Sequence, residues 1–236
     1  FQPDLAWLKD RSASGNHQLF NSIVGAGTAL ASNLTNAEFG SGGLNAFNSN
    51  GFSGNIGSTD NYVAWQWKAN GAAVSNTSGS ITSTVSANTT AGFSVVTYTG
   101  TGANATVGHG LGVAPSMVII KGRNAVTDWP VYHSSIGAAN LVFLDLTNAS
   151  SSYTTAFNST TPSSTVITLG TYNQVNFSGV TYVAYCFAAV AGYSAFGSYT
   201  GNGSADGAFV YLGFRPRFVM FKRTDTTSNW LIIDSS

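Results

Sequence analysis

The same strand-like block occurs three times in this chain, and this recurrence constrains the fold more than any other feature. Each block has a proline, then four or five mostly apolar residues, then basic residues, and the three prolines are Pro3, Pro115 and Pro216. An apolar run that follows a turn and ends in charge is typical of a strand buried on both faces. The recurrence therefore predicts a fold built from repeated β-strands.

The recurrence extends well beyond the prolines. Copies one and two keep an offset of 112 residues, and the run Leu34–Ala37 recurs unchanged as Leu146–Ala149. Copies two and three keep an offset of 101 residues, which relates Trp129 to Trp230. A period that is held over several blocks indicates tandem modules of about 100 residues.

These offsets divide the chain into four parts. We assign residues 1–72 to module 1, which lacks its N-terminal hairpin, and 73–92 to a linker of low complexity that would allow one extra edge strand. Residues 93–192 form a complete module 2, and 193–236 form the N-terminal half of module 3. Because two copies are partial, we expect the sequence to be an excerpt of a longer repetitive chain.

Composition supports a β fold. Apolar residues make up 43% and aromatic residues 13% of the chain, whereas helix formers such as Glu, Lys and Gln are scarce. Short strands separated by Gly, Asn and Ser turns predict an all-β fold of tandem antiparallel β-sandwich modules, jelly-roll or concanavalin-like. A module of this length can bury its own core, so we expect separate globules in series.

Individual strands follow from the same pattern. In module 1 we expect strands within His17–Ser22, Ala29–Leu34 and Tyr62–Trp67, and a tight turn at Asn50-Gly51. The strand that begins at Tyr62 recurs at Tyr182, at an offset of 120.

Low charge excludes several function classes. Charged residues make up 8% of the chain, and nine basic side chains balance nine acidic ones. No basic face is available to neutralise phosphates, so nucleic-acid binding is not expected. The chain also lacks a long apolar span or a cationic amphipathic stretch, which argues against membrane insertion.

The sequence does not predict an enzyme. His17, His109 and His133 occupy different positions of the repeat, and the acidic residues are scattered singly. Acid–base catalysis and metal binding both need convergent groups, so we expect neither catalytic residues nor a metal or other cofactor. The single cysteine, Cys186, lies in an apolar strand and is expected to be a buried small hydrophobe.

Basic residues that end the repeated strand are the main candidate interface. These residues are Lys121, Arg123, Lys222 and Arg223, with Lys9 and Arg11 in copy one. One interpretation is a solvated strand end whose charges pair with nearby Asp10, Asp128 or Asp225. The other is a contact between modules or subunits that repeats along a fibre. We favour the first, because exposed ion pairs contribute little to stability.

Tryptophans suggest a second kind of site, since aromatic faces stack on sugars. Trp7, Trp65 and Trp67 lie in expected core strands, where packing explains them. Trp129 and Trp230 come at the start of a strand and are the better ligand candidates, although a structural role is the more ordinary expectation.

Several blocks carry a resemblance to a known group of proteins. Gly92–Gly102, His109–Lys121, Tyr62–Ala69 and Tyr199–Arg223 resemble a repeat domain of structural proteins from marine tailed bacteriophages, and parts are similar to the laminin-G or concanavalin-like sandwich. The chain departs from the pattern at Gln66, where cysteine is expected, and in the loss of His-Gly before Leu212. The resemblance implies a virion component and supplies no catalytic residues.

From this resemblance we expect a virion structural protein, such as a tail fibre, a spike or a capsid decoration, located in the virion or outside the cell. Its expected partners are other virion subunits, with a homotrimer as one arrangement, and a glycan of the host surface. The alternative from another class is a carbohydrate-binding module of an extracellular adhesin or lectin.

Overall fold

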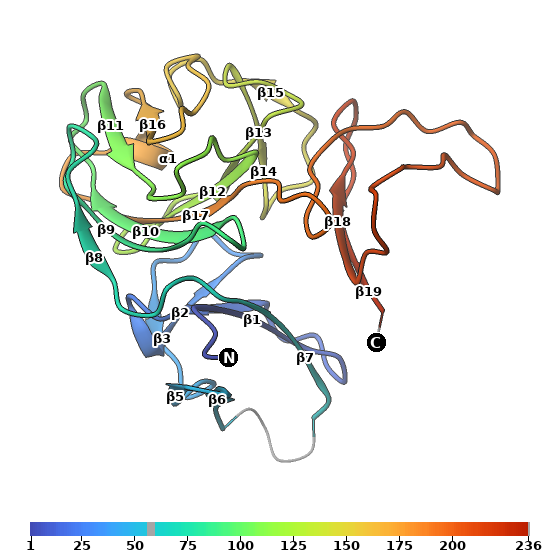
Figure 1. The fold of residues 1–236 in the computed structure, drawn as a ribbon, viewed down its shortest axis with the longest axis horizontal. Helices are drawn as coiled ribbons and strands as arrows, with labels where there is room; N and C mark the ends of the chain where they lie inside the picture. The colour runs from blue at the N-terminus through green and yellow to red at the C-terminus, as the bar shows by residue number, and fades with distance from the viewer. Residues whose placement is uncertain (56–59, 236) are drawn as a thin grey trace.

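The computed structural model describes residues 1–55 and 60–235. Figure 1 shows an all-β protein whose sheets pack face to face, and every pairing between its named strands is antiparallel. The predicted all-β class with antiparallel sheets is therefore confirmed. Among the described residues, no helix has the length and apolar content needed to cross a bilayer.

Two sheets make up most of the fold. The five-stranded sheet contains, in spatial order, β4 (Phe39–Gly40), β3 (Gly25–Ala31), β2 (Gln18–Asn21), β1 (Leu5–Asp10) and β7 (Tyr62–Trp67). The eight-stranded sheet contains β15 (Ser151–Ser152), β14 (Asn140–Phe143), β13 (Pro130–His133), β12 (Met117–Gly122), β17 (Thr181–Phe187), β10 (Phe93–Thr99), β9 (Ser83–Asn88) and β8 (Val74–Asn76). The first five strands of the larger sheet repeat the order of the smaller one.

Three two-stranded sheets and one short helix complete the described structure. The two-stranded sheets are β5 (Ala46–Asn48) with β6 (Gly51–Ser53), β11 (Ala105–Gly108) with β16 (Val166–Leu169), and β18 (Phe218–Lys222) with β19 (Trp230–Asp234). The helix is α1 (Asn173–Asn176). The expected tight turn at Asn50-Gly51 connects β5 to β6.

Strand register follows the sequence repeat in all three copies. The first pairs of the repeated hairpin are Leu5 with Asn21, Met117 with His133, and Phe218 with Asp234. These pairs are related by the offsets of 112 and 101 residues. The pairing of β1 with β7 likewise repeats in β12 with β17, where Leu5 faces Trp67 and Met117 faces Phe187. Register is set by which residues must face the core, so the repeated apolar pattern explains it.

One central core lies between the two large sheets. Leu5, Trp7 and Leu19 of the smaller sheet pack in the same cluster as Ile119 and Tyr185 of the larger sheet. The hairpin β18–β19 adds partly buried side chains to this cluster, and Figure 1 shows it beside the other two sheets. The central core is therefore shared by all three copies of the repeat.

The expectation of separate globules is wrong for this reason. Both faces of the repeated strand are apolar: Leu5 and Trp7 enter the central core, whereas Ala6 and Leu8 enter a second cluster on the outer face of the smaller sheet. In modules 1 and 2 a two-stranded sheet, β5–β6 or β11–β16, covers the outer face, so the inner face needs another cover. The neighbouring sheet provides that cover, as in a two-layer sandwich.

The expected linker is corrected as well. Residues 73–92 contain β8 and β9, which extend the eight-stranded sheet from the edge of β10. Ile81, Ser83 and Val85 are buried, because they lie against the outer core of the larger sheet. The segment therefore contributes two strands, where the sequence had suggested at most one.

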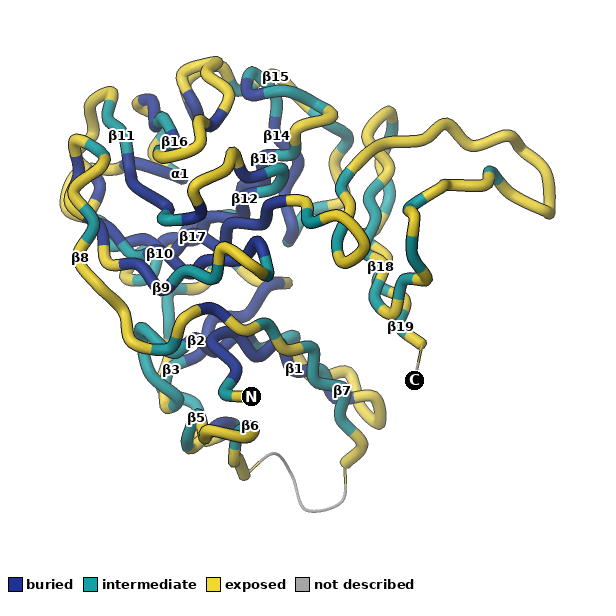
Figure 2. The backbone as a smooth tube through the Cα atoms, viewed as in Figure 1, coloured by how far each residue is buried: buried dark blue, intermediate teal, exposed yellow. Residues whose placement is uncertain are grey.

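Residues 193–235 are the most exposed part of the described chain, as Figure 2 shows. Phe209 and Tyr211 are 91% and 81% exposed in an irregular segment that leads to β18. The outer face of β18–β19 is also exposed at Val219 and Ile233, although the equivalent residues of β12 and β13 are buried. The limits of the modules stay a prediction.

Candidate functional site

The predicted interface residues of module 2 meet the loop that follows β3. We call the contacts of Lys121, Arg123 and Trp129 with residues 31–38 the first joint. The Nζ of Lys121 donates to the carbonyl of Thr35 at 2.9 Å. The indole Nε1 of Trp129 donates to the carbonyls of Ala31 and Leu34, both at 3.0 Å. These bonds connect the two large sheets through side chains from one and backbone from the other.

Lys121 is a buried cation whose polar neighbours replace water. Its side chain is 0% exposed, and its Nζ also donates to the carbonyl and the hydroxyl of Thr127 at 2.7 and 3.0 Å. The Nζ lies 5.9 Å from the centre of the Trp129 ring. Burial lowers the pKa of Lys121 to about 8, although the charges of Asp145 and Asp128 oppose this shift.

The pKa of Asp145, an acidic residue of the same region, is also shifted. Burial raises the pKa of Asp145, while the hydrogen bond that its Oδ1 accepts from the Trp129 backbone amide at 3.0 Å opposes the shift. The buried Oδ2 of Asp145 has no hydrogen-bond partner among the described residues. The charge of Lys121 is therefore held mainly by carbonyl groups, because no direct ion pair with Asp145 forms.

A second joint repeats these bonds between modules 2 and 3. We define it as the contacts of Lys222 and Trp230 with residues 143–150. The Nζ of Lys222 donates to the carbonyl of Thr147 at 3.1 Å, and the Nε1 of Trp230 donates to the carbonyl of Phe143 at 2.7 Å. Both acceptors are the sequence equivalents of the acceptors in the first joint, at an offset of 112.

Backbone hydrogen bonds repeat with the side-chain bonds. The amide of Thr127 donates to the carbonyl of Thr35 at 3.0 Å, and its equivalent, the amide of Ser228, donates to the carbonyl of Thr147 at 2.8 Å. The acceptor threonines lie in the identical runs Leu34–Ala37 and Leu146–Ala149. This loop was not assigned a role from the sequence, although its unchanged recurrence was the signal that could have revealed one.

Arg123 and Arg223, the arginines that follow the two lysines, form different kinds of ion pair. Arg123 forms an ion pair with Glu38 across the first joint, with 2.8 Å between its Nε and Oε2 of the glutamate. Arg223 pairs locally with Asp225 at 2.7 Å, where both side chains are largely exposed. The hydrogen bond from Arg223 lowers the pKa of Asp225. Of the acidic partners expected from the sequence, the described ion pairs include only Asp225.

A third set of contacts joins module 1 to module 2 and to module 3. In module 2, the hydroxyl of Tyr185 accepts a hydrogen bond from the Nδ2 of Asn21 in module 1, at 3.3 Å. The equivalent bond joins Trp65 of module 1 to Asp234 of module 3, at 3.0 Å. Phe218 also packs edge-on against Trp65, with ring centres 5.8 Å apart. Module 3 therefore lies against module 1 as module 1 lies against module 2.

The predicted ligand residues have structural roles in these contacts. Trp129 is 0% exposed and cannot present a ring face to a sugar, so its assignment as a ligand residue is corrected. Trp230 is half-buried, and its indole nitrogen already has an acceptor. For Lys121, the interpretation as a solvated strand end is also corrected, because its buried amine binds a carbonyl of module 1. The amine of Lys222 binds a carbonyl of module 2 in an exposed hydrogen bond, which agrees with a solvated strand end.

The remaining titratable groups are held in separate places. His17 accepts a hydrogen bond from the Nε1 of Trp7 at 3.0 Å, and the Nδ1 atoms of His109 and His133 accept from backbone amides two residues later. Burial raises the pKa of the Cys186 thiol to about 12 and keeps it protonated. Within residues 1–55 and 60–235, no three His, Cys, Asp or Glu side chains lie where they could hold a metal ion.

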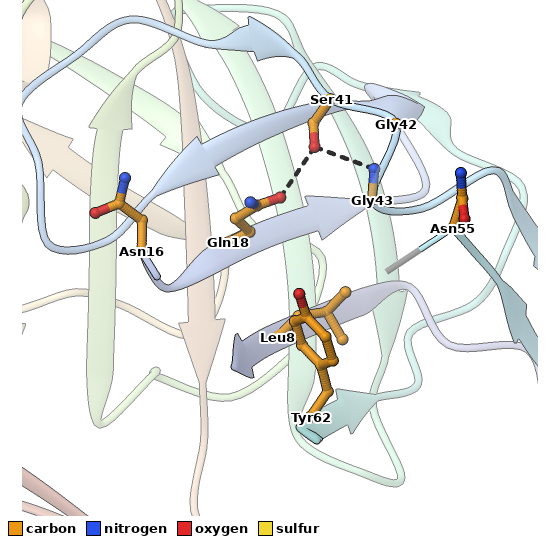
Figure 3. A pocket seen from close by; sticks show the side chains of 8 residues that line it. All are labelled: Leu8, Asn16, Gln18, Ser41, Gly42, Gly43, Asn55 and Tyr62. Carbon is orange, nitrogen blue, oxygen red and sulfur yellow. Dashed lines mark hydrogen bonds between the residues drawn. The ribbon is translucent and has the colours of Figure 1, made fainter. Parts of the chain in front are cut away.

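A pocket of about 300 Å³ lies on the outer face of the five-stranded sheet, away from the joints. Figure 3 shows the side chains that line it. They are Leu8, Asn16, Gln18, Ser41, Gly42, Gly43, Asn55 and Tyr62. All of these groups are uncharged at neutral pH, and none of them was a candidate site residue from the sequence.

The fold and these contacts define an all-β protein whose repeated sheets are joined by recurring lysine and tryptophan bonds. The chain belongs to the family described as a domain of unknown function (DUF7483), which matches residues 1–236. No curated protein and no solved structure matches the chain.

Proposed function

We propose that this protein is a structural component of a bacteriophage virion, such as a tail fibre, a spike or a capsid decoration. In this role it presents its repeated sheets for assembly with other virion subunits or for recognition of a host surface. The phage assignment rests on the sequence resemblance of blocks such as Gly92–Gly102 and His109–Lys121. The proposed structural role of the protein rests on the two joints.

The joints are the single observation that carries the structural role. Two copies of the same lysine and tryptophan contact hold three sheets around one core, and a third contact from Trp65 to Asp234 completes the set. Side chains that satisfy backbone carbonyls at buried positions fix the relative placement of the sheets. A body of this kind suits a particle component that must keep its shape outside a cell.

The proposal is tested on purified particles. Antibodies raised against the recombinant protein should label virions in immunogold electron microscopy, and mass spectrometry of the same particles should recover its peptides in stoichiometric amounts. A protein that is expressed during infection but missing from gradient-purified particles would contradict the proposal. An antibody against a major capsid protein of the same particles serves as the positive control.

A carbohydrate-binding module is the second candidate, and the neutral pocket on the five-stranded sheet favours it. The original ligand candidates, Trp129 and Trp230, do not support this function, because the joints use their indole groups. Glycan-array binding by the isolated protein would favour the second candidate. Binding of this kind is also compatible with a virion protein that recognises its host.

A further inference from the structure

The pocket exists because module 1 is shorter than module 2 at one place. Twelve residues separate Ser49 from Tyr62, whereas 22 separate their equivalents, Ser159 and Tyr182. The longer connection contains β16 and α1 (Asn173–Asn176). In module 2 these elements cover the outer face of the sheet, so the equivalent surface there is closed.

Hydrogen bonds show how α1 closes that surface. The hydroxyl of Tyr182 donates to the carbonyl of Asn173 at 2.6 Å and accepts from the amide of Phe177 at 2.9 Å. The amide of Asp128 donates to the side-chain oxygen of Gln174 at 2.8 Å. In module 2 the polar groups around this position are therefore satisfied within the protein.

The equivalent groups of module 1 face the pocket instead. Tyr62 corresponds to Tyr182, and its hydroxyl has no hydrogen-bond partner among the described residues. Figure 3 shows this hydroxyl pointing toward Gln18. Burial, helped by the charges of Asp10 and Asp60, raises the pKa of Tyr62, so its hydroxyl remains a donor at neutral pH.

Gln18 is fixed by the loop after β4. The hydroxyl of Ser41 donates to the Oε1 of Gln18 at 2.9 Å and accepts from the amide of Gly43 at 3.2 Å. This bond orients the glutamine amide and leaves its Nε2 as a donor. A side chain at position 43 would approach Gln18 and Phe20 to within 3.1 and 3.2 Å, so glycine keeps this wall of the pocket open.

We propose that this pocket binds a neutral polyhydroxylated ligand, specifically one sugar residue of a surface glycan. The proposal rests on the host-recognition part of the proposed function. Amide and hydroxyl groups offer both donors and acceptors to sugar hydroxyls, while the half-buried Tyr62 ring provides an apolar surface for the C–H face of the sugar. The volume of about 300 Å³ lies at the lower end of the range for small-molecule sites.

Charge disfavours the other ligand classes. The lining residues include no lysine, arginine or histidine that could hold an anion, and Asp10 and Asp60 lie close enough to act on Tyr62. The lining residues include no carboxylate either, so a cation would have only neutral oxygen atoms as partners. A neutral ligand loses the least on leaving water in such a pocket, because no buried charge is left without a partner.

Saturation-transfer difference NMR with the whole chain tests this proposal. The probes are glucose, galactose, mannose and N-acetylglucosamine at millimolar concentrations, with sulfate and choline, monitored by chemical-shift changes of the protein amides, as charged comparisons. We expect at least one neutral sugar to bind and the charged probes to fail. The variants Gln18→Ala and Tyr62→Phe should each weaken binding about two- to tenfold, the usual effect of one lost hydrogen bond.

The control is Tyr211→Phe, which removes an exposed tyrosine hydroxyl outside the pocket and should leave sugar binding unchanged. Failure of all four sugars, or sugar binding that neither pocket variant weakens, would overturn the proposal. If the protein is found in particles but binds no sugar, the pocket assignment fails and the structural role stands. If it binds sugar but is missing from particles, the structural role fails and the pocket assignment stands.

Discussion

The two joints share one lysine and one tryptophan hydrogen bond in different surroundings. Lys121 and Trp129 of the first joint are both 0% exposed, whereas Lys222 and Trp230 of the second are half-buried. The acceptor carbonyls lie at equivalent positions of loops that share the run Leu34–Ala37, which recurs as Leu146–Ala149. The local sequence therefore determines which atoms bond, and the number of strands around the joint determines how far the bond is shielded from water.

The contribution of each joint to the stability of the protein should follow this difference in burial. The first joint lies between two large sheets, while the second is covered on one side by the two-stranded hairpin β18–β19. When one partner of a buried hydrogen bond is removed, the other group stays buried with no water to bond. Leaving that group unsatisfied costs more free energy than the hydrogen bond itself contributes to stability. The same substitution made in each joint thus separates the effect of burial from that of bonding.

The largest difference is expected for tryptophan. Trp129→Ala should destabilise the protein by about 3–5 kcal/mol, because it empties a buried site and leaves two carbonyls without a donor. Trp230→Ala should cost about 1–2 kcal/mol, since a half-buried ring removes less apolar area from water. Guanidinium denaturation followed by circular dichroism measures both.

Trp129→Phe provides a milder version of this test if the alanine variant does not fold. It keeps most of the ring and loses the two bonds to Ala31 and Leu34. Equal losses of stability in the two joints would show that burial does not distinguish them.

A smaller effect is expected from pH. The pKa of Lys121 is about 8 in the folded protein, below its ordinary value of 10.5, so the unfolded chain binds more protons between these values. Stability from this group should therefore rise by about 2 kcal/mol between pH 8 and 10. The difference between wild type and Lys121→Met isolates this contribution in denaturation curves collected across that range.

Lys222→Met is the matched control in the second joint. Burial lowers the pKa of Lys222 in the same direction, but its partly exposed amine should give a much flatter difference curve. Tyrosines such as Tyr98, whose pKa is raised by burial, act in the opposite direction above pH 10 and cancel in each difference. A flat curve for Lys121 would mean that its charge is not buried.

The sequence predicted what depends on local pattern and missed what depends on packing. The offsets of 112 and 101 identified the repeated hairpin and its register, because side chains alternate across a strand. The same offsets could not show that the inner faces of the modules meet. An apolar residue such as Trp129 has the same local signature whether it faces its own module or the next.

The candidate site shows the same division. Lys121 and Lys222 were recognised as a recurring pair, but their acceptors are backbone carbonyls, which have no side-chain signature in the sequence. The pocket was missed because it comes from a shorter connection before Tyr62, and a difference in the length of a connection leaves no motif. Comparing the lengths of equivalent connections was the available signal.

The smallest expected difference concerns the arginines, and it sharpens the comparison because only one joint has an ion pair across it. Thr224 occupies the position equivalent to Arg123, so the second joint lacks a counterpart of the pair with Glu38. A double-mutant cycle with Arg123→Gln and Glu38→Gln should give a coupling of about 0.5–1 kcal/mol, because the pair is partly shielded. Added salt should reduce this coupling.

The cycle with Arg223→Gln and Asp225→Asn is the control for a pair in open solvent. Both of its side chains are largely exposed, and the pair joins residues of one turn, so its coupling should be too small to detect. If the exposed pair coupled as strongly as Arg123 with Glu38, shielding by the joint could not be the reason for either value. A larger coupling for Arg123 with Glu38 alone would instead show that this ion pair adds to the lysine and tryptophan bonds that hold modules 1 and 2 together.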